Sequence, residues 1–89
     1  MSDVNSTINV VVRNRNTVLF QDKVMGVTSY NDKGIFDVLP EHESFISLIK
    51  NSVIIHKNKN SSQEIKISNG VVRIYKNNVF FYVNFESQT

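Results

Sequence analysis

The sequence predicts an all-β protein, a small two-sheet β-sandwich of about eight to ten short strands. No alanine occurs among the 89 residues, and Val and Ile together make up roughly a quarter of them. β-branched side chains lose rotamer freedom in a helix but pack well on a pleated surface. Clusters of Asn and Ser recur between the apolar segments, and these residue types are typical of turns. Strands separated by short polar turns therefore account for the whole chain.

The first half of the chain predicts four strands. Residues 1–6 are polar and are expected to form a disordered tail. Apolar side chains then alternate with other residues over 8–13, which is the period of a strand. Gly26 is expected to mark a bulge or close packing, and Asn, Asp and Gly over 30–34 predict a hairpin loop. The predicted strands cover residues 8–13, 17–20, 22–29 and 35–39.

The second half predicts five further strands. Pro40 ends the preceding strand because it lacks the N–H that a ladder requires. A polar hairpin tip is expected over residues 57–62, and tighter turns over 68–70 and 76–78. The predicted strands cover residues 44–50, 52–56, 64–68, 70–76 and 79–85. These elements predict one domain over residues 7–86, with a C-terminal tail over 87–89.

Composition excludes several classes of protein. There is no Cys, so disulfide scaffolds, thiolate zinc sites and thiol nucleophiles are ruled out. The formal net charge of +2 by itself indicates no particular partner. The longest apolar runs are too short to cross a bilayer, and the N-terminus has no signal region. We therefore expect a soluble protein without a targeting segment.

The sequence contains no recognisable catalytic set. His42 stands between Glu41 and Glu43, but adjacent residues of an extended chain point to opposite faces, which favours a structural or interface role. His56 is expected to be solvated at a strand end. The three glycines are isolated, so there is no phosphate-binding loop. We predict that the chain is not an enzyme and has no catalytic, cofactor-binding or metal-binding residues.

An aromatic cluster near the C-terminus allows two interpretations. Five rings lie close in sequence to three basic residues, which could make a stacking platform for single-stranded nucleic acid. Alternation along one strand, however, sends at least half of the rings into the core and the others toward a protein partner. We favour protein contact; a small basic β-barrel that binds single-stranded nucleic acid, or a module for carbohydrate or peptide, remain as alternatives. The residues are Tyr75, Phe80, Phe81, Tyr82 and Phe85, with Lys66, Arg73 and Lys76.

Several segments together resemble a known family. The turn Asn31-Asp32-Lys33-Gly34 leads directly into Ile35-Phe36-Asp37-Val38 and then Leu39-Pro40-Glu41-His42. Downstream, a glycine-containing segment over 67–74 precedes the turn Lys76-Asn77-Asn78-Val79. In this order and spacing, over about residues 8–85, the chain resembles the N-terminal β-sandwich domain of the epsilon subunit of rotary ATP synthases, called delta in mitochondria. Glu41 stands where that family usually has Gly.

This resemblance implies a function. Members are non-catalytic subunits of the central stalk of proton-translocating F-type ATP synthases, where they dock on the gamma subunit and the c-ring and couple rotation to ATP synthesis. No cofactor and no nucleic acid are implied. The expected location is the cytoplasmic face of the inner (plasma) membrane, as a peripheral subunit, or the organellar equivalent. Because the sequence ends at Thr89, we expect the domain without the family's C-terminal helical hairpin.

The resemblance also implies a partner-binding site. The β-hairpin loop is expected to be the tip that faces the c-ring, with Asp32 and Lys33 as candidates for polar contacts and Ile35 for an apolar one. His42 is expected on the surface that faces gamma. The predicted partner-binding residues are Tyr30, Asn31, Asp32, Lys33, Gly34, Ile35 and His42.

Overall fold

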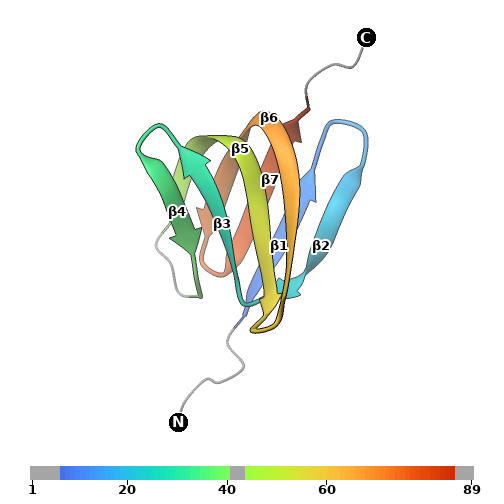
Figure 1. Ribbon diagram of the computed structural model, residues 1–89, viewed down its shortest axis with the longest axis vertical. Coiled ribbons are helices and arrows are strands. Elements are labelled where there is room, and N and C mark those ends of the chain that lie inside the picture. Colours follow the sequence, from blue (N-terminus) through green and yellow to red (C-terminus); the bar gives the residue numbers. More distant parts are fainter. Residues whose placement is uncertain (1–6, 41–43, 86–89) are drawn as a thin grey trace.

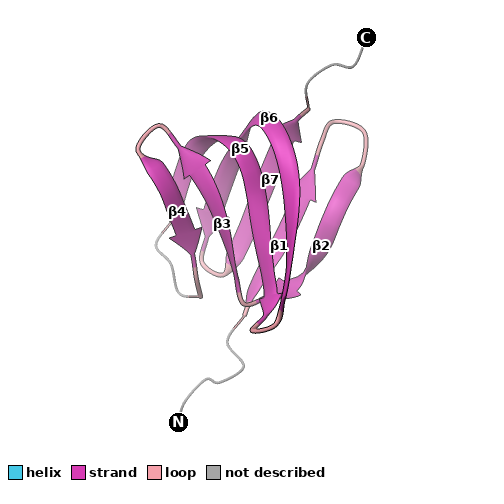
Figure 2. Ribbon diagram, in the orientation of Figure 1, coloured by secondary structure: helices cyan, strands magenta, loops and turns pink. Residues whose placement is uncertain are grey.

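The computed structural model describes residues 7–40 and 44–85, which form seven strands and no helix (Figures 1 and 2). This confirms the all-β class. The predicted tails at 1–6 and 87–89, and His42, lie outside the described residues. The strands are β1 (Ile8–Arg13), β2 (Val18–Val24), β3 (Gly26–Asn31), β4 (Gly34–Val38), β5 (Phe45–Asn58), β6 (Ser61–Tyr75) and β7 (Asn78–Asn84).

The strands form one continuous sheet that folds over itself into a sandwich (Figure 1). Their order is β2-β1-β7-β6-β5-β3-β4, and only β1 and β7 are parallel among these pairs. The first layer contains β2, β1 and β7 with the C-terminal half of β6 and the N-terminal half of β5. The second layer contains the other halves of β5 and β6 with β3 and β4. The two long strands therefore join the layers.

The two long strands replace four predicted short ones. The predicted turn at 68–70 is wrong, because β6 runs without interruption through it, and 44–50 and 52–56 belong to one strand, β5. Asn51 has a φ of 71°, and the β5–β6 register shifts beside it. In β6 the buried positions change phase between Ile67 and Gly70. Such bulges bend a strand and increase its twist, which lets both halves turn their apolar side chains toward the core.

The predicted boundary after residue 20 is also wrong. β2 continues to Val24, and the break comes at Met25, where the chain passes from the first layer to the second. The amide of Met25 donates a hydrogen bond of 3.0 Å to the carbonyl of His56. Gly26 packs closely as expected, since an added Cβ would lie 2.9 Å from a methyl carbon of Leu39.

Branched aliphatic side chains fill the core, and Phe81 is the only aromatic residue fully buried with them among the described residues. The expectation that at least half of the C-terminal rings lie in the core is therefore wrong. Valine and isoleucine already occupy the narrow space between the layers, so the rings on the other side of β7 face outward. The core contains Ile8, Val10, Val12, Val24, Val27, Val38, Ile49, Val53, Ile55, Ile67, Val72, Ile74, Val79, Phe81 and Val83.

Asparagine side chains organise three of the hairpin turns. The side-chain oxygens of Asn14, Asn31 and Asn58 each accept a hydrogen bond of 2.8 Å from the backbone N–H two residues later. This local bond closes the turn without help from the rest of the fold. It explains why the polar clusters located these turns correctly from sequence.

Candidate functional site

The predicted partner-binding residues other than His42 come together in the β3–β4 hairpin. Tyr30 pairs with Ile35, and Asn31 pairs with Gly34, so Asp32 and Lys33 alone make the turn. Gly34 has a φ of 119°, a conformation that favours glycine, and it completes the reversal. Ile35, with 64% of its surface exposed, begins the returning strand. The tip therefore combines a charged turn with an exposed apolar side chain.

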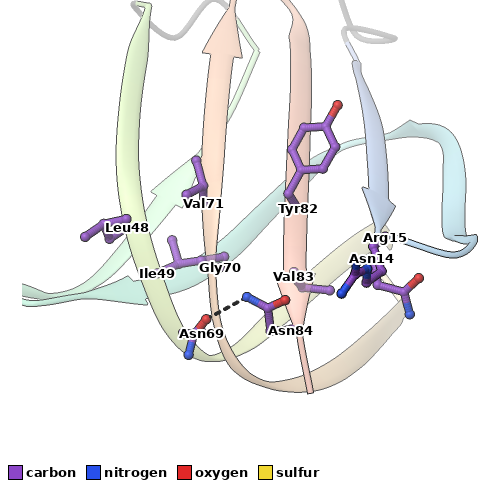
Figure 3. Close-up of a pocket in the computed structure, with 10 residues that line it drawn as sticks. All are labelled: Asn14, Arg15, Leu48, Ile49, Asn69, Gly70, Val71, Tyr82, Val83 and Asn84. Atoms are coloured by element: carbon purple, nitrogen blue, oxygen red, sulfur yellow. Dashed lines mark hydrogen bonds between the residues drawn. The ribbon is translucent and has the colours of Figure 1, made fainter. Parts of the chain in front are cut away.

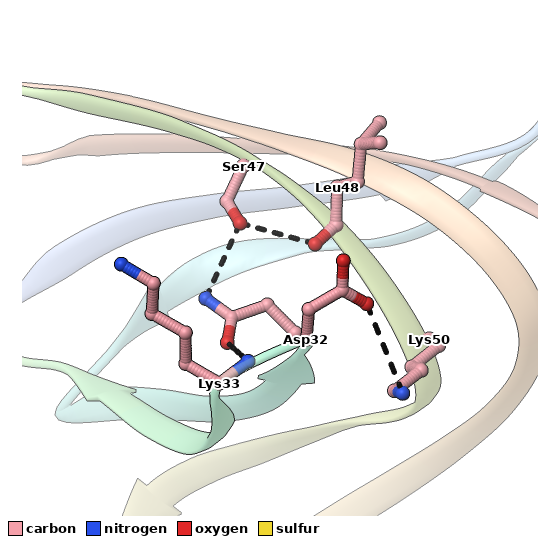
Figure 4. A network of polar contacts seen from close by, with 6 residues as sticks. Asp32, Lys33, Ser47, Leu48 and Lys50 are labelled. Carbon is pink, nitrogen blue, oxygen red and sulfur yellow. Dashed lines mark hydrogen bonds and ion pairs between the residues drawn. The ribbon is translucent and has the colours of Figure 1, made fainter.

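Polar contacts hold this hairpin against β5 (Figure 4). The Asn31 side-chain amide donates to Ser47 Oγ at 3.3 Å, and Ser47 Oγ donates to the Leu48 carbonyl at 3.0 Å. Lys50 Nζ lies 3.9 Å from Asp32 Oδ1, but both side chains are exposed, so solvent screening weakens this ion pair. The tip thus lies beside the N-terminal half of β5.

A second and larger surface adjoins the tip. Two rows of outward-facing side chains cross the first layer, and we call them together the apolar face. Leu48 and Ile46 are 73% and 69% exposed, although their neighbours along β5 turn toward the core. One row is Leu48, Val71, Tyr82, Arg13 and Val18; the other is Ile46, Arg73, Phe80, Val11 and Gln21.

Polar rows border the apolar face on both sides. On one side Asn84 donates from its side-chain amide to Asn69 at 2.8 Å, and on the other Asn9 donates to Asn78 at 3.1 Å. An apolar centre with a hydrogen-bonding rim is the usual anatomy of a protein–protein interface. Exposed contiguous apolar surface of this kind marks an interaction site.

A cavity of about 490 Å³ opens on the apolar face (Figure 3). It lies between Leu48 and Tyr82, and Val71, Gly70 and Arg15 also line it. A Cβ on Gly70 would come within 2.4 Å of the Tyr82 carbonyl oxygen, so glycine is required where β6 and β7 approach this closely. The cavity offers a place for an apolar side chain of a partner.

A different polar network links three strands of the second layer. The Thr28 hydroxyl donates to Asp37 Oδ1 at 2.5 Å and lies 2.7 Å from His56 Nε2. Because the hydroxyl has one proton, which the carboxylate accepts, Nε2 is the donor in the second bond. A nucleophilic hydroxyl would instead donate to the imidazole. The network is therefore structural, and the expectation of a solvated His56 is wrong.

Removing this hydroxyl should destabilise the domain. We expect Thr28→Val to lower the free energy of unfolding by about 1–2 kcal/mol, because the half-buried His56 ring loses its partner and the hydrogen bond to Asp37 is lost as well. Thr28→Ser keeps the hydroxyl and should retain most of the stability. Urea unfolding followed by circular dichroism measures both, and equal stability of the Val variant and the parent chain would contradict the role of the network.

The described residues contain no group of three or more His, Asp or Glu side chains that could hold a metal ion. Within the same residues, no helix is long and apolar enough to cross a membrane. The β3–β4 hairpin lies where the sequence predicts it, and Phe80 and Tyr82 share the outward side of β7 while Phe81 and Val83 share the inward side. Ile46 and Leu48 are not among the site residues predicted from the sequence. The nearly continuous apolar run over 45–49 is a signal for them, because it indicates that both sides of this strand meet apolar surroundings.

Comparison with known proteins identifies relatives of this arrangement. Residues 7–85 match the family described as "ATP synthase, Delta/Epsilon chain, beta-sandwich domain". The chain is 38% identical over 60 residues to the ATP synthase epsilon chain of Sulfurovum sp., covering 66% of this chain and 47% of that protein. It is 32% identical over 79 residues to the epsilon chain of Sulfurimonas denitrificans, covering 88% of this chain and 61% of that protein. The chain thus spans about half to three fifths of the length of these relatives.

Solved structures share the fold. A chain of the Euglena gracilis mitochondrial ATP synthase (OSCP/F1/c-ring) superposes with a TM-score of 0.81 at 15% identity, covering 92% of this chain and 53% of that one. A chain of the Tetrahymena thermophila mitochondrial ATP synthase central stalk and c-ring gives a TM-score of 0.70 at 14% identity, covering 85% and 62%.

Proposed function

Because the chain belongs to the β-sandwich domain family of ATP synthase delta and epsilon chains, we propose that it acts as a non-catalytic subunit of the central stalk of an F-type ATP synthase. The observation that carries this proposal is the apolar face with its polar rim, which suits a permanent protein contact. Its role there is assembly of the stalk and coupling of rotation to ATP synthesis. In this role it is peripheral to the membrane, at its cytoplasmic face or the organellar equivalent.

In this proposal the chain contacts the gamma subunit and the c-ring through two different surfaces. The apolar face docks on the gamma subunit, because it is the larger apolar surface and has a cavity beside its Leu48 row. The β3–β4 tip contacts the c-ring through Asp32, Lys33 and Ile35. His42, proposed to face gamma, lies outside the described residues. The tip adjoins Leu48 through its contacts with β5, so one partner complex can cover both surfaces.

Calorimetric titration of the purified chain with the gamma subunit of the same source tests the proposal. We expect a one-to-one complex that is stable at moderate salt. An absence of heat and of co-elution over the accessible concentration range would refute the docking role and leave the fold unaffected.

The tip is tested separately. We expect Ile35→Asp to weaken binding to a detergent-solubilised complex of gamma and the c-ring at least threefold, because the substitution places a charge on an exposed apolar contact. Binding to gamma alone should stay within twofold, and stability should change little because Ile35 is exposed. Asn60→Asp, which adds the same single negative charge at the exposed β5–β6 turn, is the matched control. Equal losses in both variants would refute the assignment of the tip.

Nucleic-acid binding is the second candidate. Arg73 and Arg13 stand beside the exposed rings of Phe80 and Tyr82, a combination that can also hold single strands by stacking and charge. Lys66 lies beyond the bend of β6 and does not extend this surface. Titration with a labelled oligonucleotide at low salt distinguishes the two candidates, since phosphate contacts weaken steeply as salt rises.

A further inference from the structure

The apolar face contains cations but no carboxylate. Arg73 and Arg13 each stand within a row, next to Phe80 and Tyr82 respectively. Arg15 lines the cavity. Neither row includes Asp or Glu. The apolar face therefore carries positive charge, which the surface of any partner that covers it has to balance.

No carboxylate among the described residues forms an ion pair with these three arginines. Within residues 7–40 and 44–85 the ion pair that forms joins Asp32 to Lys50 at the tip, and Asp37 is engaged with Thr28 in the second layer. Asp22 is paired in register with Val10, and its Oδ1 accepts a hydrogen bond of 2.8 Å from the backbone N–H of Lys23, not from an arginine. Glu64 lies on the N-terminal half of β6, opposite Ile54. Arg13 Nε donates a hydrogen bond of 3.2 Å to the neutral carbonyl oxygen of Asn14. The positive charge of the three arginines is otherwise left to solvent when the face is uncovered.

Covering the face removes this solvent. A charge that loses water without gaining a counter-charge opposes association, whereas a guanidinium paired with a carboxylate through two hydrogen bonds is favourable and directional. Arg13 and Arg73 stand within the two rows, so a partner that covers the face brings apolar groups against their side chains. A second copy of the chain would set like charges against each other, which disfavours self-association through this face.

We propose that the partner covering the apolar face presents an apolar surface with carboxylates opposite Arg13, Arg15 and Arg73, and that these pairs select the partner and set its orientation. This inference rests on the proposed function, in which that partner is the gamma subunit. The cavity between Leu48 and Tyr82 receives an apolar side chain, and the carboxylates surround it.

Charge reversal tests this inference. The chain and its Arg13→Glu and Arg73→Glu variants are titrated against purified gamma at two salt concentrations, after thermal melts establish that each variant is folded. We expect each reversal to raise the Kd at least tenfold at low salt, with a smaller difference at high salt. Lys66→Glu makes the same charge change at an exposed cation beyond the bend of β6, and it should bind gamma within twofold of the parent chain.

The outcomes separate this inference from the proposed function. If both arginine variants bind gamma as the parent does while Leu48→Asp does not, the charge pairing is wrong and the docking role stands. If the parent chain does not bind gamma, both are wrong. Tight, salt-sensitive binding of an oligonucleotide that the arginine variants lose, without binding to gamma, would identify a phosphate-bearing partner and overturn both.

Discussion

Leu48→Asp should raise the Kd for the gamma subunit at least about 30-fold, the size expected when an apolar anchor of an interface is lost. Leu48 is 73% exposed and forms one wall of the cavity on the apolar face. In the complex an aspartate there would be buried among apolar groups without a partner. In the isolated domain the same side chain stays in water, so the melting temperature should change little. Calorimetric titration and a thermal melt measure the two effects independently.

Met25→Asp provides the matched control for this substitution. It adds the same charge at an exposed apolar residue, and Met25 lies between β2 and β3, outside both rows of the apolar face. We expect binding within twofold of the parent chain. If the two variants bind gamma equally well, the apolar face is not the docking surface. If both lose binding equally, net charge rather than position decides the affinity.

Gly70→Ala should lower the free energy of unfolding by about 3 kcal/mol, the upper part of the range for overpacking. The added carbon would meet backbone atoms, at 2.4 Å from the Tyr82 carbonyl oxygen and 3.0 Å from Val83 Cα, so no rotation of a side chain can relieve the clash. Relief requires β6 and β7 to separate at the bend. For a domain of this size such a loss lowers the melting temperature by roughly 12 °C or more.

Gly26→Ala is the comparison for Gly70→Ala, because its added carbon is also crowded but less severely. Its added carbon would meet the Leu39 side chain at 2.9 Å, which can move, and the Val38 carbonyl at 3.0 Å. We expect a smaller loss than for Gly70→Ala. Equal stability of the two variants in urea unfolding would show that the β6–β7 approach is not the constraint that the structure indicates.

Local chemistry explains which features sequence could predict. Asn14, Asn31 and Asn58 close their turns through bonds to residues two positions away, so these turns depend on nothing distant. The alternation of Val10 and Val12 with their neighbours likewise marks β1 from its own residues. The tip follows from the same kind of signal, since Gly34 and the polar turn before it are contiguous.

Features that depend on distant contacts could not be predicted. Ser68, Asn69 and Gly70 look like a turn, but pairing with β5 and β7 on both sides keeps β6 extended and converts the irregularity into a bend. His56 looks like a solvated strand end until β3 places Thr28 beside it. In both cases the deciding partner lies more than ten residues away.

By itself the sequence determined the all-β class, most of the turns and the β3–β4 hairpin, because β-branched content, alternation and turn chemistry act between neighbours in the chain. Only the tertiary structure decided the number of strands, the partners of His56 and the position of the apolar face. That face exists because register sets Leu48, Val71 and Tyr82 side by side from three strands. Register is a property of paired strands, and it decides whether exposed apolar residues scatter or form one surface.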